Sequence, residues 1–129
     1  MAGNLSDYLE DALLDHFLGT SSLTAPSAVY VALFTVAQDD AGTAGTEVSG
    51  GSYVRKAASF DASSGGATAN TSDIDFTNMP ACTVVGVGVY DHVSNSTNLL
   101  IHGTLTSSKT VDAGDTLRIS AGDLDISIT

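Results

Sequence analysis

Residues 28–36 read Ala28-Val-Tyr-Val-Ala-Leu-Phe-Thr-Val36, and this stretch decides the fold. In an extended strand, successive side chains point to opposite faces. The apolar side chains here occupy both faces, with Val29, Val31 and Leu33 on one and Tyr30, Ala32 and Phe34 on the other. Such a strand is covered on two sides, either by two sheets or by a sheet and a helix. The stretch therefore predicts a layered β-protein.

The chain on either side of this strand is divided into short alternating segments by turn residues. Further strands are expected within residues 53–60, 67–70, 72–77, 83–91, 99–105, 117–119 and 124–128, with turns at 63–66, 78–80 and 94–98. Gly86 and Gly88 within a Val-rich run indicate close approach by a bulky group. The repeated Ala-Gly-Asp turns at 113–115 and 121–123 are typical of a hairpin or meander. Seven to eight strands predict an all-β fold, a β-sandwich with a jelly roll as the expected topology.

One segment, residues 4–18, has helical periodicity instead. Its apolar stripe comprises Leu5, Tyr8, Leu9, Ala12, Leu13 and Phe17. Asn4 is the expected N-cap and Gly19 the expected C-cap. A lone helix either closes one end of its own sandwich or docks on another chain, and the pattern leaves both open. The expected organisation is a helix and linker over residues 1–22 and a β-sandwich over 23–129, in one globular domain.

Composition excludes several classes of function. The net charge of −11 would repel a phosphate backbone, so no nucleic-acid partner is expected. Acidic residues interrupt the N-terminal segment, so no signal peptide is expected there, and no segment is long and apolar enough to cross a membrane. The single cysteine, Cys82, rules out an internal disulfide and is expected to be a small buried hydrophobe.

No constellation of catalytic or ligand-binding residues is present in the sequence. His16, His92 and His102 have no metal-ligand spacing, and Gly86-Val-Gly88 lacks the rest of a phosphate loop. Asp39 and Asp40 are the one acidic pair in a loop flexible enough to wrap a cation, but further ligands cannot be named. We therefore predict no catalytic, cofactor or metal site. The long loop over residues 38–52 is instead a candidate contact surface.

Several phrases, in order along the chain, resemble a known family. They are Asn4-Leu-Ser-Asp-Tyr-Leu-Glu10, Val29-Tyr-Val-Ala-Leu-Phe34, Gly45-Thr-Glu-Val-Ser-Gly-Gly-Ser-Tyr53, Asn70-Thr-Ser-Asp-Ile74, Asn98-Leu-Leu-Ile-His-Gly103 and Ser108-Lys-Thr-Val-Asp-Ala-Gly-Asp-Thr116. Together they resemble small proteins encoded among the structural genes of tailed bacteriophages. Members of that family are often labelled tail-fibre protein, and similar small β-proteins serve as capsid decoration or cement proteins. The resemblance implies a virion protein made in the bacterial cytoplasm.

The resulting hypothesis is a non-enzymatic capsid decoration protein that binds the major capsid protein on the outer shell and stabilises it. The alternative is a tail-fibre or tail-associated structural protein. A homo-oligomer is expected, with a trimer favoured because similar cement proteins are often trimers, and a dimer as the other option. The predicted subunit or capsid contacts are Leu5, Tyr8, Leu9, Ala12, Leu13, Phe17, Asp39, Asp40, Glu47 and Tyr53. A small carbohydrate-active or metal-dependent enzyme is the rival from another class, and cation binding or glycan turnover would reveal it.

Overall fold

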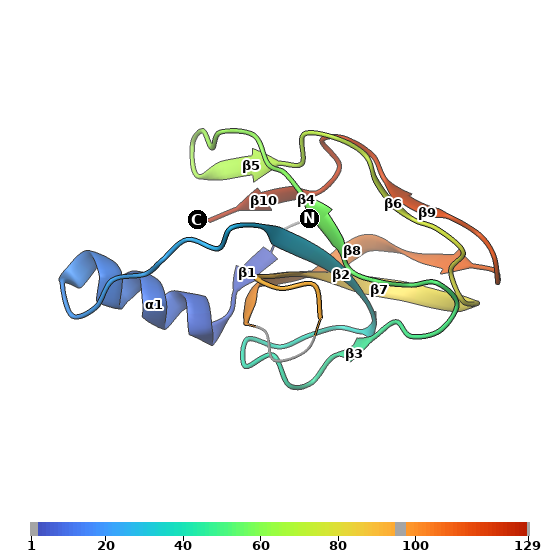
Figure 1. Cartoon of the computed structure of the whole chain (residues 1–129), viewed down its shortest axis with the longest axis horizontal. Coiled ribbons are helices and arrows are strands. Elements are labelled where there is room, and N and C mark those ends of the chain that lie inside the picture. The colour runs from blue at the N-terminus through green and yellow to red at the C-terminus, as the bar shows by residue number, and fades with distance from the viewer. Residues whose placement is uncertain (1–2, 95–97, 129) are drawn as a thin grey trace.

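An antiparallel six-stranded sheet forms the main layer of the protein, and two short two-stranded ribbons form a second layer (Figure 1). The computed structural model describes residues 3–94 and 98–128; part of the expected turn at 94–98 therefore lies outside the described residues. In chain order the elements are β1 (Gly3–Leu5), α1 (Asp7–Leu18), β2 (Val29–Val36), β3 (Thr46–Glu47), β4 (Lys56–Ala58), β5 (Ala67–Ala69), β6 (Ile74–Phe76), β7 (Cys82–Tyr90), β8 (Leu99–Val111), β9 (Leu117–Ile119) and β10 (Asp125–Ser127). The all-β class with one N-terminal helix is confirmed, and the jelly-roll topology stays a prediction.

Strand β2 lies inside the main sheet. The sheet order is β1-β8-β7-β2-β3, and β4 pairs with β2 on the same edge as β3. Four consecutive residues, Val31 to Phe34, are at most 1% exposed. The burial of this strand on both faces, predicted from its sequence, is therefore confirmed.

Two apolar clusters cover the two faces of β2. Between the layers, Val31 and Leu33 pack in one cluster with residues of the ribbons, among them Ile74, Phe76 and Leu117. On the other face of the sheet, a smaller cluster unites Ala32, Phe34, Tyr90 and Leu99. The larger cluster is the core of the sandwich, and the smaller one lies outside it.

The close approach predicted at Gly88 is confirmed in the smaller cluster. A Cβ atom at this position would lie 3.0 Å from the Phe34 ring and 3.2 Å from the Tyr90 ring. These distances are shorter than an ordinary van der Waals contact. Glycine at position 88 therefore lets the two rings pack directly against the backbone of β7, with their centroids 6.4 Å apart.

The second layer is built by strands that are remote in sequence. β5 pairs with β10, and β6 pairs with β9, each in antiparallel register. The expectation that the last two strands pair with each other as a hairpin is wrong. The Ala-Gly-Asp turn at 121–123 does follow β9, but each flanking strand finds its partner between residues 67 and 76 instead.

Asn70 joins the two ribbons at their irregular centre. The side chain is 2% exposed. Its Oδ1 accepts a hydrogen bond from the Leu124 amide at 2.9 Å, and its Nδ2 donates to the carbonyls of Ser72 at 2.8 Å and Ser120 at 3.1 Å. One buried amide therefore holds three backbone groups where regular strand pairing is interrupted.

We expect Asn70→Ala to lower the free energy of unfolding by roughly 2 kcal/mol or more, because it leaves buried backbone groups without partners. Urea denaturation followed by circular dichroism measures the change. Asn98→Ala is the matched control, since the Asn98 amide donates to Asp91 at 2.9 Å on the exposed surface. Equal losses in the two variants would contradict the role given to Asn70.

Candidate interaction surface

The helix and the segment that follows it form a projecting helical arm, here defined as residues 6–23. The arm begins later than the periodicity predicts, because Asn4 and Leu5 belong to β1 and pair with His102 and Ile101 of β8. The N-cap is Ser6, whose Oγ accepts a hydrogen bond from the Leu9 amide at 3.2 Å. The expected N-cap, Asn4, is therefore wrong, and Leu5 lies outside the helix.

The base of the arm is fixed to the sheet through Ser6 and Asp7. Ser6 is 1% exposed; its amide donates to the Leu100 carbonyl at 2.9 Å, and its hydroxyl donates to the carbonyl of Leu99. The Asp7 amide donates to the Asp40 carbonyl at 2.9 Å. These bonds set the direction in which the helix leaves the sheet.

The far end of the arm is closed by a left-handed glycine. Gly19 has φ +88°, as the predicted C-cap requires, and its amide donates to the Asp15 carbonyl at 3.1 Å. Beyond it, Thr20 donates to Asp15 Oδ1 at 2.9 Å, and the Leu23 amide donates to Nδ1 of His16 at 3.1 Å. His16 thus ties the returning chain to the helix.

The arm leaves its own apolar stripe largely uncovered. Figure 1 shows α1 extending away from the sheet, and no residue of the helix is buried. Of the predicted contact residues, Leu9, Ala12 and Leu13 are half-buried, and the side chains of Tyr8 and Phe17 are 43% and 76% exposed. The helix therefore does not close its own sandwich.

Leu14 and Leu18 extend the exposed surface at the end of the helix. They are 58% and 76% exposed, and together with Phe17 they are defined here as the arm tip. Their spacing of i, i+3 and i+4 places them close together on the helix surface. The arm tip is the most exposed apolar part of the helix.

An apolar groove opens between the main sheet and the β5–β10 ribbon, beside the base of the arm. It has a volume of about 310 Å³. Its lining includes Leu9, Val29, Phe60, Val89, Ile126 and Ile128, and no charged side chain is among the residues that line it. Sequence reasoning missed this groove, because it arises from two layers that come together only in the fold.

A second hollow, of about 440 Å³, lies between β8 and β9. Its lining includes the charged side chains of Lys109, Arg118 and Asp123. Arg118 is already engaged, with its Nε 2.7 Å from Asp75 Oδ1. This hollow therefore has a mixed polar and apolar surface, unlike the groove beside the arm.

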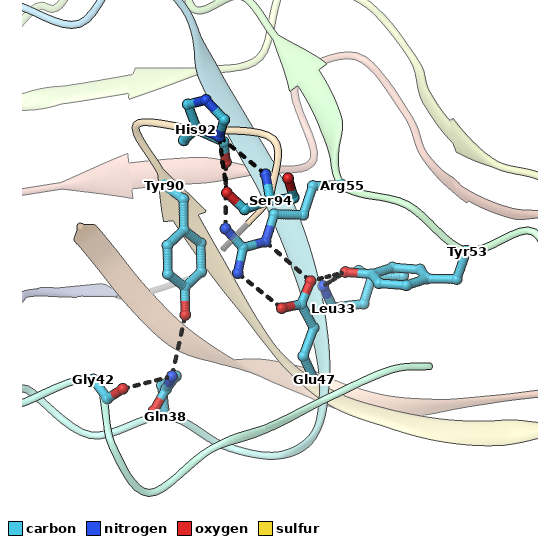
Figure 2. A network of polar contacts seen from close by, with 9 residues as sticks. All are labelled: Leu33, Gln38, Gly42, Glu47, Tyr53, Arg55, Tyr90, His92 and Ser94. Carbon is cyan, nitrogen blue, oxygen red and sulfur yellow. Dashed lines mark hydrogen bonds and ion pairs between the residues drawn. The ribbon is translucent and has the colours of Figure 1, made fainter. Parts of the chain in front are cut away.

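The long loop after β2 is held to the sheet by a polar clamp, defined as Glu47, Tyr53 and Arg55 (Figure 2). Arg55 donates to both carboxylate oxygens of Glu47, at 2.9 and 3.0 Å. The Tyr53 hydroxyl donates to Glu47 Oε2 at 2.8 Å and accepts from the Leu33 amide at 2.9 Å. The Tyr53 ring stacks on Phe76 with centroids 5.9 Å apart, which joins the clamp to the core.

The clamp also reaches the outer cluster of the sheet. The guanidinium carbon of Arg55 lies 3.8 Å from the centroid of the Tyr90 ring, a cation–π contact. Gln38 Nε2 donates to the Tyr90 hydroxyl at 3.1 Å and to the Gly42 carbonyl at 3.2 Å. Glu47 and Tyr53 thus have partners within the chain, and their contact with another protein stays a prediction.

Asp39 and Asp40 point to different partners rather than to a common ion. Asp39 Oδ1 accepts hydrogen bonds from the Thr43 and Ala44 amides at 2.8 and 3.2 Å, and these bonds hold the pKa of its carboxyl below the usual value. Asp40 Oδ1 lies 2.7 Å from Nε2 of His102, whose side chain is buried in β8. The pair therefore shapes the loop and fixes it to the sheet.

Within residues 3–94 and 98–128, no three His, Cys, Asp or Glu side chains are grouped so that they could hold a metal ion. The same residues contain no helix with the length and apolar character needed to span a membrane. Cys82 is only partly buried, and burial raises the pKa of its thiol.

Comparison with known proteins identifies the family. Residues 4–127 match the family model described as podophage GP4 fiber I protein gp80. The chain belongs to this family. The match includes both the helical arm and the sandwich, and it confirms the resemblance to phage structural proteins labelled as tail fibre. No curated protein matches the sequence.

The clamp gives a prediction for alkaline pH. Burial, followed by the negative charge of Glu47, raises the pKa of Tyr53 above 10.0, the usual value for a tyrosine phenol. Above pH 10 the unfolded chain releases the phenol proton while the folded chain retains it, so stability should fall as pH rises. We expect Tyr53→Phe to cost about 1–2 kcal/mol at pH 7, because the Leu33 amide loses its acceptor. Above pH 10, the stability of the same variant should fall less steeply than that of the unsubstituted protein, because the variant has no phenol proton to release at position 53.

Thermal unfolding from pH 7 to 11 measures both effects. Tyr8→Phe is the control, since Tyr8 is 43% exposed on the arm and should leave the unfolding curve unchanged. An alkaline slope in Tyr53→Phe as steep as in the unsubstituted protein would contradict the role given to the buried phenol.

Proposed function

We propose that the chain is a structural subunit of a phage fibre carried on the virion, with no catalytic role. The observation that carries this proposal is the match of residues 4–127 to a family described as a fiber protein. The fibre role was the alternative in the sequence analysis, and the family description favours it over binding to the major capsid protein on the shell.

The helical arm supports an assembly role. A fibre subunit must contact its neighbours, and contacts between protein chains are centred on apolar side chains that lose their exposure to water. The arm tip supplies such side chains, and Phe17 is 76% exposed in the single chain. The arm is therefore the proposed attachment element, and the homo-oligomer expected from the sequence remains part of the proposal.

Copy number in the purified virion tests the fibre assignment, with quantitative mass spectrometry against the major capsid protein as the measurement. Fibres attached around a symmetric tail require on the order of tens of copies, whereas a protein covering the shell requires hundreds. We expect the lower number. Hundreds of copies would instead support the capsid decoration role.

Immunogold labelling tests where on the virion the protein lies. Antibody against the sandwich should label the tail region of intact virions and leave the shell unlabelled. Uniform labelling of the shell would contradict the fibre assignment even if the copy number were low.

A further inference from the structure

We propose that the apolar groove of one copy receives the arm tip of a second copy of this chain. This inference deepens the proposed function and rests on it, because it names the partner of the helical arm. It requires that the arm tip be exposed, that the groove be open and apolar, and that other pairings of the arm be less favourable.

The arm tip has the form of a helical anchor. Leu14, Phe17 and Leu18 follow the i, i+3, i+4 spacing by which amphipathic helices enter apolar grooves, and each is more than half exposed. The His16 ring packs edge-on against Phe17, with centroids 5.0 Å apart. The anchor lies in the last turns of α1, which extends away from the sheet of its own copy (Figure 1).

The groove has the complementary surface. Its floor combines Val29 and Val89 from the main sheet with Ile126 from the ribbon layer. Ile128, at its margin, is 57% exposed, and its amide is held by the Gly66 carbonyl at 2.8 Å. An apolar groove of about 310 Å³ that stays open among the described residues, 3–94 and 98–128, is suited to a few aliphatic or aromatic side chains from a partner.

Charge favours the groove over a second arm as the site of docking. Asp7, Glu10 and Asp11 occupy the first turns of the helix, and Asp15 follows nearer the tip. Two arms packed in parallel would bring these carboxylates together, and two antiparallel arms would press the carboxylates of one against the apolar tip of the other. Both arrangements cost desolvation or repulsion. Docking of the tip in an uncharged groove leaves the carboxylates in water.

The arrangement also sets the symmetry. Because the arm of one copy meets the groove of the next, the interface is heterologous and generates either a closed ring or a filament. A stable interface buries roughly 800 Å² per partner, more than three side chains provide, so the proposed interface also includes the returning segment at residues 20–23, which is mostly exposed in the single chain. In a ring, each copy would use both its arm and its groove.

Complementation between two variants tests the proposal. Phe17→Asp removes the anchor and keeps the groove, whereas Ile128→Asp places a charge at the groove and keeps the arm. Both side chains are more than half exposed, so both variants should fold, as circular dichroism would verify. Val54→Asp is the matched control, because Val54 is 51% exposed and belongs to neither surface.

Size-exclusion chromatography with light scattering, on the full chain at tens of micromolar, gives the readout. We expect oligomers for the unsubstituted protein and for Val54→Asp, and monomers for each of the other two variants alone. An equimolar mixture of Phe17→Asp and Ile128→Asp should form a 1:1 dimer and nothing larger, because one intact arm and one intact groove remain.

Three results would overturn the proposal. A monomeric unsubstituted protein would mean that the arm binds a different partner. Oligomers of Ile128→Asp as large as those of the unsubstituted protein would mean that the groove is not the docking site. A mixture that stays monomeric would exclude arm-in-groove docking. None of these results bears on copy number in the virion, so the fibre assignment stands or falls separately.

Discussion

The burial of β2 on both faces is the constraint on which the rest of the structure depends. Val31 and Leu33 need a cover on one side, and the ribbon layer supplies it through Phe76 and its neighbours. On the other side Phe34 is 1% exposed, packed with Tyr90 in the outer cluster. The polar clamp fixes the long loop beside that cluster, since Arg55 stacks on the Tyr90 ring. The loop is therefore a structural part of the sheet as well as a candidate surface.

Much of the fold follows from local sequence, and the remainder depends on pairing between distant segments. The doubly apolar strand, the glycine beneath the Phe34 ring and the Gly19 cap could all be predicted, because each depends only on residues that are adjacent in the sequence. The helix start could not, because Leu5 fits the helical stripe and is instead paired with Ile101. The last two strands likewise have partners between residues 67 and 76 that no local pattern reveals. In the candidate site, the helix and its apolar stripe could be predicted, whereas the exposure of the stripe was left open and the groove was missed.

The single chain stabilises the arm only in part by burial, because no residue of the helix is fully buried. A helix of 12 residues is marginal in water on its own, and most helices in proteins gain stability from packing of one face. Here Ser6 and Gly19 cap the two ends, yet Phe17 and Leu18 remain 76% exposed. Covering the tip would therefore stabilise the helix and the assembly together. This coupling suits the proposed role as a fibre subunit, and the family to which the chain belongs is described as a fiber protein.

Hydrogen exchange of the arm tests this account most directly. Amides of residues 7–18 would be followed by mass spectrometry in the dilute single chain and in the assembled protein, with β2 as the internal reference. The account predicts that arm amides exchange rapidly in the single chain and become protected on assembly, while the amides of β2 are protected in both. Arm amides that exchange at the same rate in the two states would contradict the claim that assembly covers the arm.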